Sequence, residues 1–248
     1  MTRAVLITGG MSDIGRAAAA AFARAGYAVA VNYRRHAGQA EAFARELQER
    51  HGAPRALALK ADIRQRTEVS AMMDAAWQEL GGLTVLVNNA GINKDRAFLE
   101  MSDEEWHTVL DTILTGPFLC AQEFARRFTG ESGCILNLGA TTGLKGRKNG
   151  VNYCSARAGI LTFTKCLALE LAPRIRVNTI TPGWIDTAEV RERYQLELPE
   201  NLAKAEASVP LGRLGRPEEI ASLMVYLAEA GSYISGQNFF VDGGYYMH

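Results

Sequence analysis

The chain has 248 residues and a formal net charge of zero, because 27 Lys and Arg residues balance 27 Asp and Glu residues. With 48% hydrophobic and 22% charged residues, the composition is that of an ordinary globular protein, and the length suffices for one large core. No apolar run approaches the roughly 20 residues of a membrane span, the first residues reach glycine too early for a signal-peptide core, and zero net charge disfavours a nucleic-acid partner. Four cysteines without ligand spacing predict reduced thiols, no metal site and a cytoplasmic location.

Short apolar runs alternate with stretches of helical periodicity along the chain. In chain order the first half predicts a strand over 3–8, a helix over 14–26, a strand over 27–33, a helix over 38–51, a strand over 55–60, a helix that runs through residue 80, and a strand over 83–88. The second half predicts a long helix from Ser102, a strand over 134–138, a helix over 151–171, a strand over 174–180, a helix over 218–229 and a strand over 238–241. Ser102 and Glu105 have the spacing of a capping box.

Alternation of helices with unbroken apolar strands predicts a parallel sheet that is covered on both faces. We therefore expect one doubly wound α/β domain over residues 1–248, with seven parallel strands. The segment 183–215 is charged, irregular and interrupted by Pro199 and Pro210. Ligands of doubly wound sheets bind beyond the carboxyl ends of the strands, so this segment is predicted to be a substrate lid. A solvated surface loop is the alternative.

Two segments carry the first functional signal. The segment Thr8-Gly9-Gly10-Met11-Ser12-Asp13-Ile14-Gly15 joins the first strand to the first helix. Glycines at that place let the backbone approach a pyrophosphate at a helix N-terminus, although glycine also serves tight turns that bind nothing. Asn88-Asn89-Ala90-Gly91 follows at the end of the fourth strand.

With these segments, the chain resembles the short-chain dehydrogenases/reductases over essentially its full length, and it is most similar to their 3-oxoacyl-(acyl-carrier-protein) reductases. The further motifs that carry the resemblance are Asp62-Ile63, Tyr153-x-x-x-Arg157, Arg176-Val177-Asn178, Pro182-Gly183, Val241-Asp242-Gly243-Gly244, and the stretches 91–101 and 244–247. The resemblance implies a Rossmann fold and a nicotinamide cofactor. It implies that the cofactor is bound by Gly9, Ser12, Asp13, Ile14, Gly15, Asp62, Ile63, Asn89, Ala90, Gly91, Tyr153, Arg157, Pro182, Gly183, Ile185 and Thr187.

The residues after the second predicted strand indicate which cofactor is bound. An acidic residue there would bind the ribose 2′-hydroxyl and favour NAD. The chain instead has Asn32-Tyr33-Arg34-Arg35, with two guanidiniums and no carboxylate. Arginine is the preferred bidentate ligand of phosphate, so Arg34 and Arg35 predict NADP(H). The alternative is that both arginines are solvated turn residues.

Asp13 departs from the family pattern, which has a glycine at its place in the turn. An aspartate there has the chemistry to cap the helix. A carboxylate at a helix N-terminus also competes with a phosphate for the same donors. We therefore expect either that Asp13 points away from the phosphate site or that cofactor binding is weakened.

The catalytic positions depart further. The family transfers a hydride between nicotinamide and a carbonyl carbon, with Tyr as general acid, a Lys four residues on, a Ser that holds the substrate oxygen, and an Asn on the long helix. Tyr153 is in place, but Arg157 replaces the Lys, Ala140 the Ser and Ile113 the Asn. Arg157 keeps the positive charge that favours a phenolate but cannot hand on a proton.

Two nearby features bear on the lost groups. Pro117 lacks an N–H and would bend the helix at residue 113, which frees the carbonyl that the family uses for a relay water. Helix kinking for packing alone is the alternative. Loss of one donor to a developing oxyanion typically costs roughly 10²–10³-fold in rate. Thr141, Thr142 and Ser155 are the neighbouring hydroxyls that have the chemistry to replace it.

The first functional hypothesis is an NADPH-dependent ketoreductase with an atypical site, acting on a β-ketoacyl thioester or a related biosynthetic intermediate. The alternatives are a cofactor-binding homologue without turnover that serves as a partner subunit, and an enzyme of unusual chemistry on the same scaffold. The helices from Ser102 and Val151 carry apolar residues on more than one face, which predicts a homotetramer or homodimer. The expected partners are a small or carrier-bound acyl substrate, with no nucleic acid and no membrane.

Overall fold

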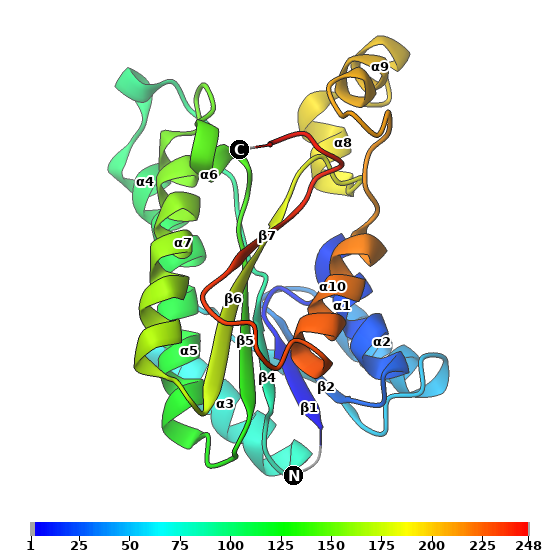
Figure 1. Ribbon diagram of the computed structural model, residues 1–248, viewed down its shortest axis with the longest axis vertical. Helices are drawn as coiled ribbons and strands as arrows, with labels where there is room; N and C mark the ends of the chain where they lie inside the picture. The colour runs from blue at the N-terminus through cyan, green and yellow to red at the C-terminus, as the bar shows by residue number, and fades with distance from the viewer. Residues whose placement is uncertain (1–2, 248) are drawn as a thin grey trace.

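In the computed structural model, which describes residues 3–247, seven parallel strands form one sheet in the order β3-β2-β1-β4-β5-β6-β7 (Figure 1). The strands are β1 (Ala4–Ile7), β2 (Ala28–Tyr33), β3 (Ala56–Lys60), β4 (Val85–Asn88), β5 (Gly133–Leu138), β6 (Ile175–Pro182) and β7 (Asn238–Val241). Each strand coincides with a predicted apolar run, so the predicted doubly wound fold is confirmed.

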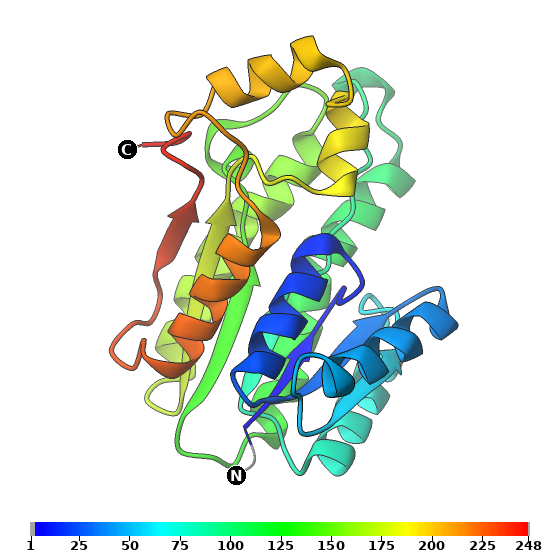
Figure 2. The same cartoon turned by 90° about the vertical axis from the view of Figure 1, so that its right-hand side faces the viewer.

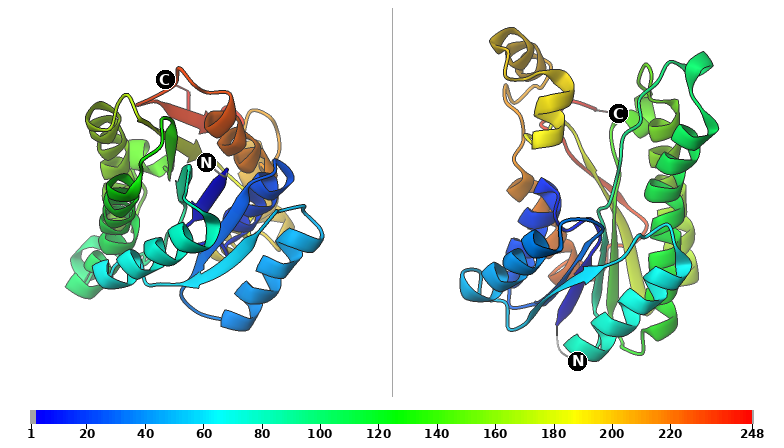
Figure 3. Two further views of the ribbon diagram at one scale, coloured as in Figure 1. Left: turned by 90° about the horizontal axis from the view of Figure 1, so that it is seen from below. Right: turned by 180° about the vertical axis from the view of Figure 1, so that it is seen from behind.

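Helices cover both faces of the sheet, as the view from below shows (Figure 3). One face carries α1 (Asp13–Arg24), α2 (Ala37–Glu49) and α10 (Pro217–Glu229); the other carries α3 (Arg66–Leu80), α5 (Gly116–Arg127) and α7 (Val151–Glu170), with α4 (Asp103–Leu110) before α5. In strand β1, successive side chains point to opposite faces of the sheet and so pack into the two apolar clusters on either side of it. Its Val5 belongs to the apolar cluster of Phe22 on α1, whereas Leu6 belongs to the cluster of Phe124 on α5. A parallel sheet buried on both faces requires such strands.

The strand order reverses between β1 and β4, which opens a crevice at the carboxyl ends of these strands. Three short helices surround that edge: α6 (Thr142–Lys145), α8 (Ala188–Tyr194) and α9 (Pro199–Ala207). Figures 1 and 2 show α8 and α9 standing beyond the ends of the strands. The fold therefore gathers the predicted functional segments at one edge of the sheet.

The long helix predicted from Ser102 is in fact interrupted. Its predicted start is confirmed, because the Ser102 hydroxyl accepts from the Glu105 N–H and the Glu105 carboxylate accepts from the Ser102 N–H. A π-helical turn over Asp111–Thr115 then separates α4 from α5. Pro117 has no N–H to donate to the Ile113 carbonyl, and Gly116 donates to Asp111, five residues back. The prediction of a local distortion at residue 113 is correct.

The segment 183–215 is less irregular than its sequence indicates, because it contains α8 and α9. A small apolar cluster of Leu196, Ala205 and Leu214 packs inside it, with Trp184 against its edge. Sequence reasoning missed both helices because they are short and rich in charged residues. Among the described residues, no helix has both the length and the apolar character to span a membrane.

The apolar side chains that predicted subunit packing divide into two groups. Phe124, Phe128 and Ile160 are buried in the chain's own core, so they give no evidence of a partner. Phe118 on α5 is 40% exposed. Leu169 on α7, which is not among the side chains that predict this packing, is 83% exposed. The four cysteines are free thiols, and burial raises the pKa of Cys120 to about 12 and that of Cys134 to about 11.

Candidate functional site

The crevice at the carboxyl edge holds three connected cavities. A cavity of about 280 Å³ at the β2 and β3 end shares Met11, Ser12, Gly91 and Ile92 with a central cavity of about 600 Å³. A third cavity of about 120 Å³ is lined in part by residues of α8 and shares its wall at Tyr153 with the central one. Every predicted site residue except Gly15 and Ile113 lines at least one of these cavities.

The glycine-rich turn is packed so tightly that side chains are excluded. Gly9 has φ of +61°, and a Cβ atom there would lie 2.8 Å from the Cα atom of Ala90. A Cβ atom on Gly15 would lie 2.4 Å from the Gly9 carbonyl oxygen. The Asn89 side chain donates to the carbonyls of Thr8 and Gly9, both at 2.9 Å, and thereby ties the turn to β4. Gly15 thus acts through the shape of the turn.

The N-cap of α1 is Ser12 and not Asp13. The Ser12 hydroxyl accepts from the Gly15 N–H at 3.2 Å. Asp13 is the first helical residue, and its carboxylate accepts from the backbone N–H of Ala188, the first residue of α8, at 2.7 Å. Both residues line the central cavity. The Asp13 carboxylate therefore bridges the glycine-rich turn and α8 across the cleft.

Arg34 and Arg35 line the cavity of about 280 Å³ at the β2 and β3 end, together with Asp62 and Ile63. The Asp62 carboxylate accepts from Nε of Arg64 at 2.9 Å and lies 3.9 Å from the Arg34 guanidinium. The hydrogen bond from Arg64, aided by both positive charges, holds the pKa of Asp62 below its usual value despite partial burial. Sequence reasoning missed Arg64, whose role depends on a turn that brings it back onto Asp62.

Tyr153 and Arg157 lie one helical turn apart on α7 at the wall of the central cavity. The guanidinium carbon of Arg157 lies 5.1 Å from the centroid of the Tyr153 ring. Arg157 is only 7% exposed, and it donates to the carbonyl of Leu138 at the end of β5. A Cβ atom at Gly91 would lie 2.8 Å from an Arg157 nitrogen, so glycine there makes room for the guanidinium. The Nε atom of Arg157 is buried without a partner among the described residues.

The other two altered positions supply no polar side chain. Ala140 lines both the central and the small cavity beside Tyr153, where it presents only a methyl group. Ile113 is 1% exposed within an apolar cluster that also contains Val109 and Ile160. It lines none of the three cavities, so its side chain is core.

Arg147 is the main residue at the site that sequence reasoning missed. It lies in the loop between α6 and α7, with its guanidinium carbon 5.2 Å from the centroid of the Tyr153 ring. It pairs with Asp95 at 2.7 Å and donates to Asn93 at 3.2 Å. A Cβ atom at Gly150 would lie 2.9 Å from its Nε, so this glycine provides the space. Loop residues have no periodicity that would have indicated this contact.

Comparison with known proteins places this site in a family. A family model described as enoyl-(acyl carrier protein) reductase matches residues 9–246. A 3-oxoacyl-(acyl-carrier-protein) reductase of Staphylococcus aureus is 37% identical over 250 residues, covering 100% of this chain and 99% of that protein. A crystal structure of a short-chain dehydrogenase/reductase from Brucella melitensis superposes with a TM-score of 0.91 at 31% identity, covering 99% of this chain and 97% of that one. The chain belongs to the short-chain dehydrogenase/reductase family.

Two further relatives agree with this assignment. A 3-oxoacyl-(acyl-carrier-protein) reductase of Synechocystis is 38% identical over 249 residues, 98% of this chain and 96% of that protein. A short-chain type dehydrogenase/reductase from Mycobacterium marinum is 38% identical with a TM-score of 0.89, over 99% of this chain and 96% of that one. As a short-chain dehydrogenase/reductase, the protein is an NAD(P)-dependent oxidoreductase. The family description names an enoyl group and the relatives a 3-oxoacyl group, so the substrate is a separate question.

Proposed function

We propose that this short-chain dehydrogenase/reductase is an NADPH-dependent ketoreductase that acts on a β-ketoacyl thioester or a related biosynthetic intermediate. The observation that carries the proposal is that Tyr153, at the wall that the central and small cavities share, lies beside the buried cation Arg157, which lines the central cavity. A hydroxyl acid beside a fixed positive charge, at the junction of a cofactor cleft and a substrate cavity, suits protonation of a carbonyl oxygen. The relatives' name, 3-oxoacyl-(acyl-carrier-protein) reductase, supports the substrate class.

The residues of the cleft fit a dinucleotide. The two connected cavities run from Arg34 and Arg35 past the glycine-rich turn to Pro182 and Gly183. The unpartnered Nε atom of Arg157 suits a group with acceptor oxygens, such as ribose hydroxyls. We infer NADP(H) because two guanidiniums line the adenosine end, while the nearby carboxylate of Asp62 is neutralised by Arg64. A bound nicotinamide supplies the hydride that the reduction requires.

In this proposal the chain's own residues supply the proton that the carbonyl oxygen takes up. Tyr153 gives its phenolic proton to the carbonyl oxygen as that oxygen gains negative charge. Arg157 packs against the ring and places a fixed positive charge beside it. Because a guanidinium does not release protons, the phenolate is reprotonated from water and not through Arg157.

We also propose that the segment 183–215 is the substrate lid, because Trp184, Glu189, Val190, Arg193 and Tyr194 line the small cavity. The proposed partners are a carrier-bound or small acyl substrate and further copies of this chain, as a homotetramer or homodimer. Exposed Phe118 and Leu169 support the assembly. A cytoplasmic location, without nucleic-acid or membrane partners, fits this activity.

One observation favours a second candidate function, that of a homologue without catalytic turnover. The Asp13 carboxylate lies in the central cavity against the N–H of Ala188, where it opposes a pyrophosphate. Ala140 and Ile113 add no polar group. On this candidate the protein would act as a structural subunit.

The deciding experiment pairs cofactor binding with turnover. Fluorescence titration is expected to give NADPH a dissociation constant at least about tenfold below that of NADH, with 3-oxobutanoyl thioester reduced at the expense of NADPH. The variant Tyr153→Phe is expected to bind NADPH normally and to lose turnover. Binding of neither cofactor favours the structural subunit, and full activity in Tyr153→Phe contradicts the role of this tyrosine.

A further inference from the structure

Three residues that line the small cavity beside Tyr153 each have a buried polar atom that lacks a hydrogen-bond partner in the described part of the chain. Six buried side-chain nitrogen or oxygen atoms have no hydrogen-bond partner among the described residues, and three belong to residues that line this cavity. They are Oγ1 of Thr142, Nε of Arg147 and Nε1 of Trp184. Native proteins leave few such atoms unpaired, because each loses its hydrogen bonds to water on burial. Three around one cavity of about 120 Å³ point to a ligand that carries hydrogen-bond acceptors.

Only one of the three atoms is a hydroxyl. The Arg147 guanidinium already binds Asp95, Asn93 and the Tyr194 hydroxyl through its other nitrogens. The Trp184 ring is held by the Tyr194 ring at a centroid distance of 4.6 Å and belongs to the edge of the lid cluster. Oγ1 of Thr142 makes no hydrogen bond within the described residues. It alone among the three has the chemistry of the serine hydroxyl that is missing at Ala140.

The place of Thr142 is fixed by how α6 packs. Thr142 is the first residue of α6, four residues beyond the end of β5 and two residues beyond Ala140. A Cβ atom on the next residue, Gly143, would lie 2.9 Å from the Arg157 carbonyl carbon and 2.9 Å from the Ala158 nitrogen. The two helices therefore meet backbone to backbone, one turn beyond Tyr153. This contact fixes the position of α6 against α7, and Thr142 and Tyr153 line the same cavity.

We propose that Thr142 holds the reacting carbonyl oxygen of the substrate, in place of the absent hydroxyl at Ala140. The inference rests on the proposed ketoreductase function. The Thr142 hydroxyl donates a hydrogen bond to the carbonyl oxygen and is unchanged at the end of the reaction, while Tyr153 provides the proton that is transferred. Thr141 also lines the cavity, but its hydroxyl is not among the buried atoms that lack a partner.

The test compares four variants with the wild type in steady-state reduction of 3-oxobutanoyl thioester. Thr142→Val keeps the shape and removes the hydroxyl, and it is expected to lower kcat by about 10²–10³-fold. Thr142→Ser is expected to stay within a few-fold of wild type. Thr141→Val removes the other threonine hydroxyl of the cavity and is expected to cost less activity than Thr142→Val. The double variant Ala140→Ser with Thr142→Val returns a hydroxyl to the neighbouring position and is expected to recover most of the lost rate. NADPH affinity and melting temperature are expected to be unchanged in all four.

Three results would overturn the role of Thr142. The first is a Thr142→Val enzyme as active as the wild type. The second is a loss in Thr141→Val that equals the loss in Thr142→Val. The third is a loss in Thr142→Val that neither Thr142→Ser nor the added Ala140→Ser repairs, because packing alone would then explain it.

A binding measurement separates this role from the proposed function. In the Tyr153→Phe background with NADP⁺ present, calorimetry measures the affinity for 3-oxobutanoyl thioester, and Thr142→Val is expected to weaken it at least about tenfold. If the wild type turns over no ketone but this loss is found, the ketoreductase proposal fails and the contact of Thr142 with the ligand stands. If the parent protein does not bind the thioester, both proposals fail.

Discussion

At the scale of single residues, Asp13 is the most consequential departure from the family pattern. Its carboxylate lies 2.7 Å from the N–H of Ala188, on the wall of the central cavity. A pyrophosphate bound there would meet a like charge and would lose one backbone donor to it. The charge of Asp13 therefore opposes the binding of a nicotinamide dinucleotide in this cleft.

Removal of that charge is expected to tighten cofactor binding. Asp13→Asn should lower the dissociation constant of NADPH about tenfold at low salt, the order expected for one partly screened like-charge contact. Asp13→Gly should do the same, and the gain should shrink as salt is added. Fluorescence titration measures both, with Glu41→Asn, an exposed position on α2, as the control. An Asp13→Asn protein that binds NADPH no better than wild type would contradict this reading of the cleft.

Asp13 also shows which features of a single residue the sequence predicts and which it does not. The sequence identifies the misplaced carboxylate and its two possible orientations, because turn chemistry is local. It does not identify Ala188 as the partner, which is 175 positions away along the chain. The same limit applies to Ser12, which takes the N-cap although Asp13 has equal capping chemistry, and to Arg147, which reaches the site from a loop without periodicity.

At the scale of elements, α8 is fastened to the loop before α4 by a small set of polar contacts. Asp95 pairs with Arg147 at 2.7 Å and with Arg193 of α8 at 3.2 Å. Asn93 donates to Glu189 of the same helix at 3.1 Å. Asp95 therefore joins three parts of the site: its own loop, Arg147 beside Tyr153, and α8.

Loss of the Asp95 charge is expected to loosen α8. The variant Asp95→Asn weakens both ion pairs and thereby lowers the free energy of local opening. Trypsin should then cleave several-fold faster at the arginines and lysines of segment 183–215. The matched control is Asp74→Asn, which removes the partner of Arg127 far from the lid. Time courses followed by mass spectrometry give the cleavage sites. Equal cleavage rates in both variants would show that the Asp95 pairs do not hold the helix.

Elements differ in how well the sequence predicts them. The seven strands are predicted because β1, β2, β4 and β5 are mostly apolar and are buried along their whole length, a pattern that parallel sheets impose. Helices α8 and α9 are missed because seven and nine residues span too few turns to show a face. The π-helical turn is predicted in part. Pro117 predicts that the helix is distorted here, but the kind of distortion depends on how α4 and α5 pack against α7.

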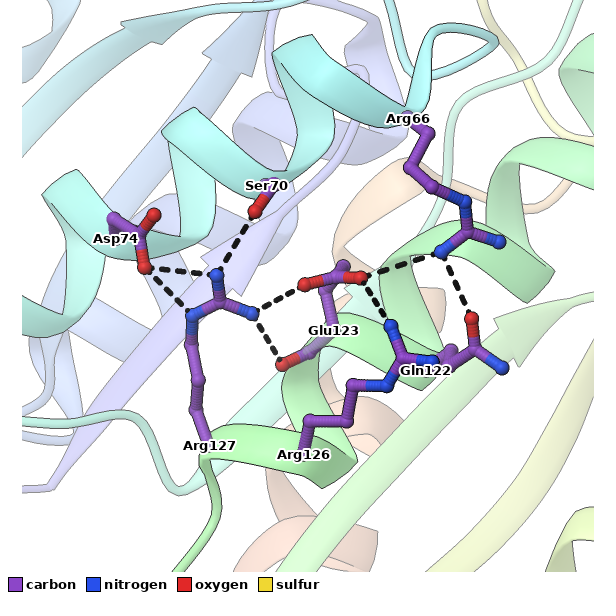
Figure 4. Close-up of polar contacts among 7 residues, drawn as sticks. All are labelled: Arg66, Ser70, Asp74, Gln122, Glu123, Arg126 and Arg127. Carbon is purple, nitrogen blue, oxygen red and sulfur yellow. Dashed lines mark hydrogen bonds and ion pairs between the residues drawn. The ribbon is translucent and has the colours of Figure 1, made fainter.

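At the scale of the whole molecule, the face of the sheet that carries α3 and α5 is bound together by a buried carboxylate. Glu123 on α5 is 5% exposed and accepts from Arg126 at 2.9 Å and from Arg127 (Figure 4). Arg66 of α3 also reaches it, at 3.3 Å, and Arg127 continues to Asp74 on α3 at 2.8 Å. Three arginines around one carboxylate join the two helices above the core.

This network makes the stability of the fold depend on pH. The hydrogen bond from Arg127, with further help from Arg126, keeps the pKa of Glu123 below its usual value although burial opposes this. The folded state thus stabilises the charged form of Glu123 more than the unfolded chain does. Its contribution is complete above about pH 4.3, the usual pKa of a glutamate in an unfolded chain, and is lost as pH falls through the lower folded value.

Glu123→Gln is accordingly expected to lower the free energy of unfolding by about 2 kcal/mol at pH 7, since it leaves charged partners without their carboxylate. The value is below that of a fully buried pair because the side chains of Arg66 and Arg126 are 45% and 61% exposed and screened by water. The difference from wild type should shrink as pH falls below 4, in urea denaturation followed by circular dichroism. Glu41→Gln, an exposed carboxyl on α2, should show no such difference at any pH. A deficit in Glu123→Gln that is the same at pH 7 and pH 3 would mean that packing, and not charge, makes Glu123 stabilising.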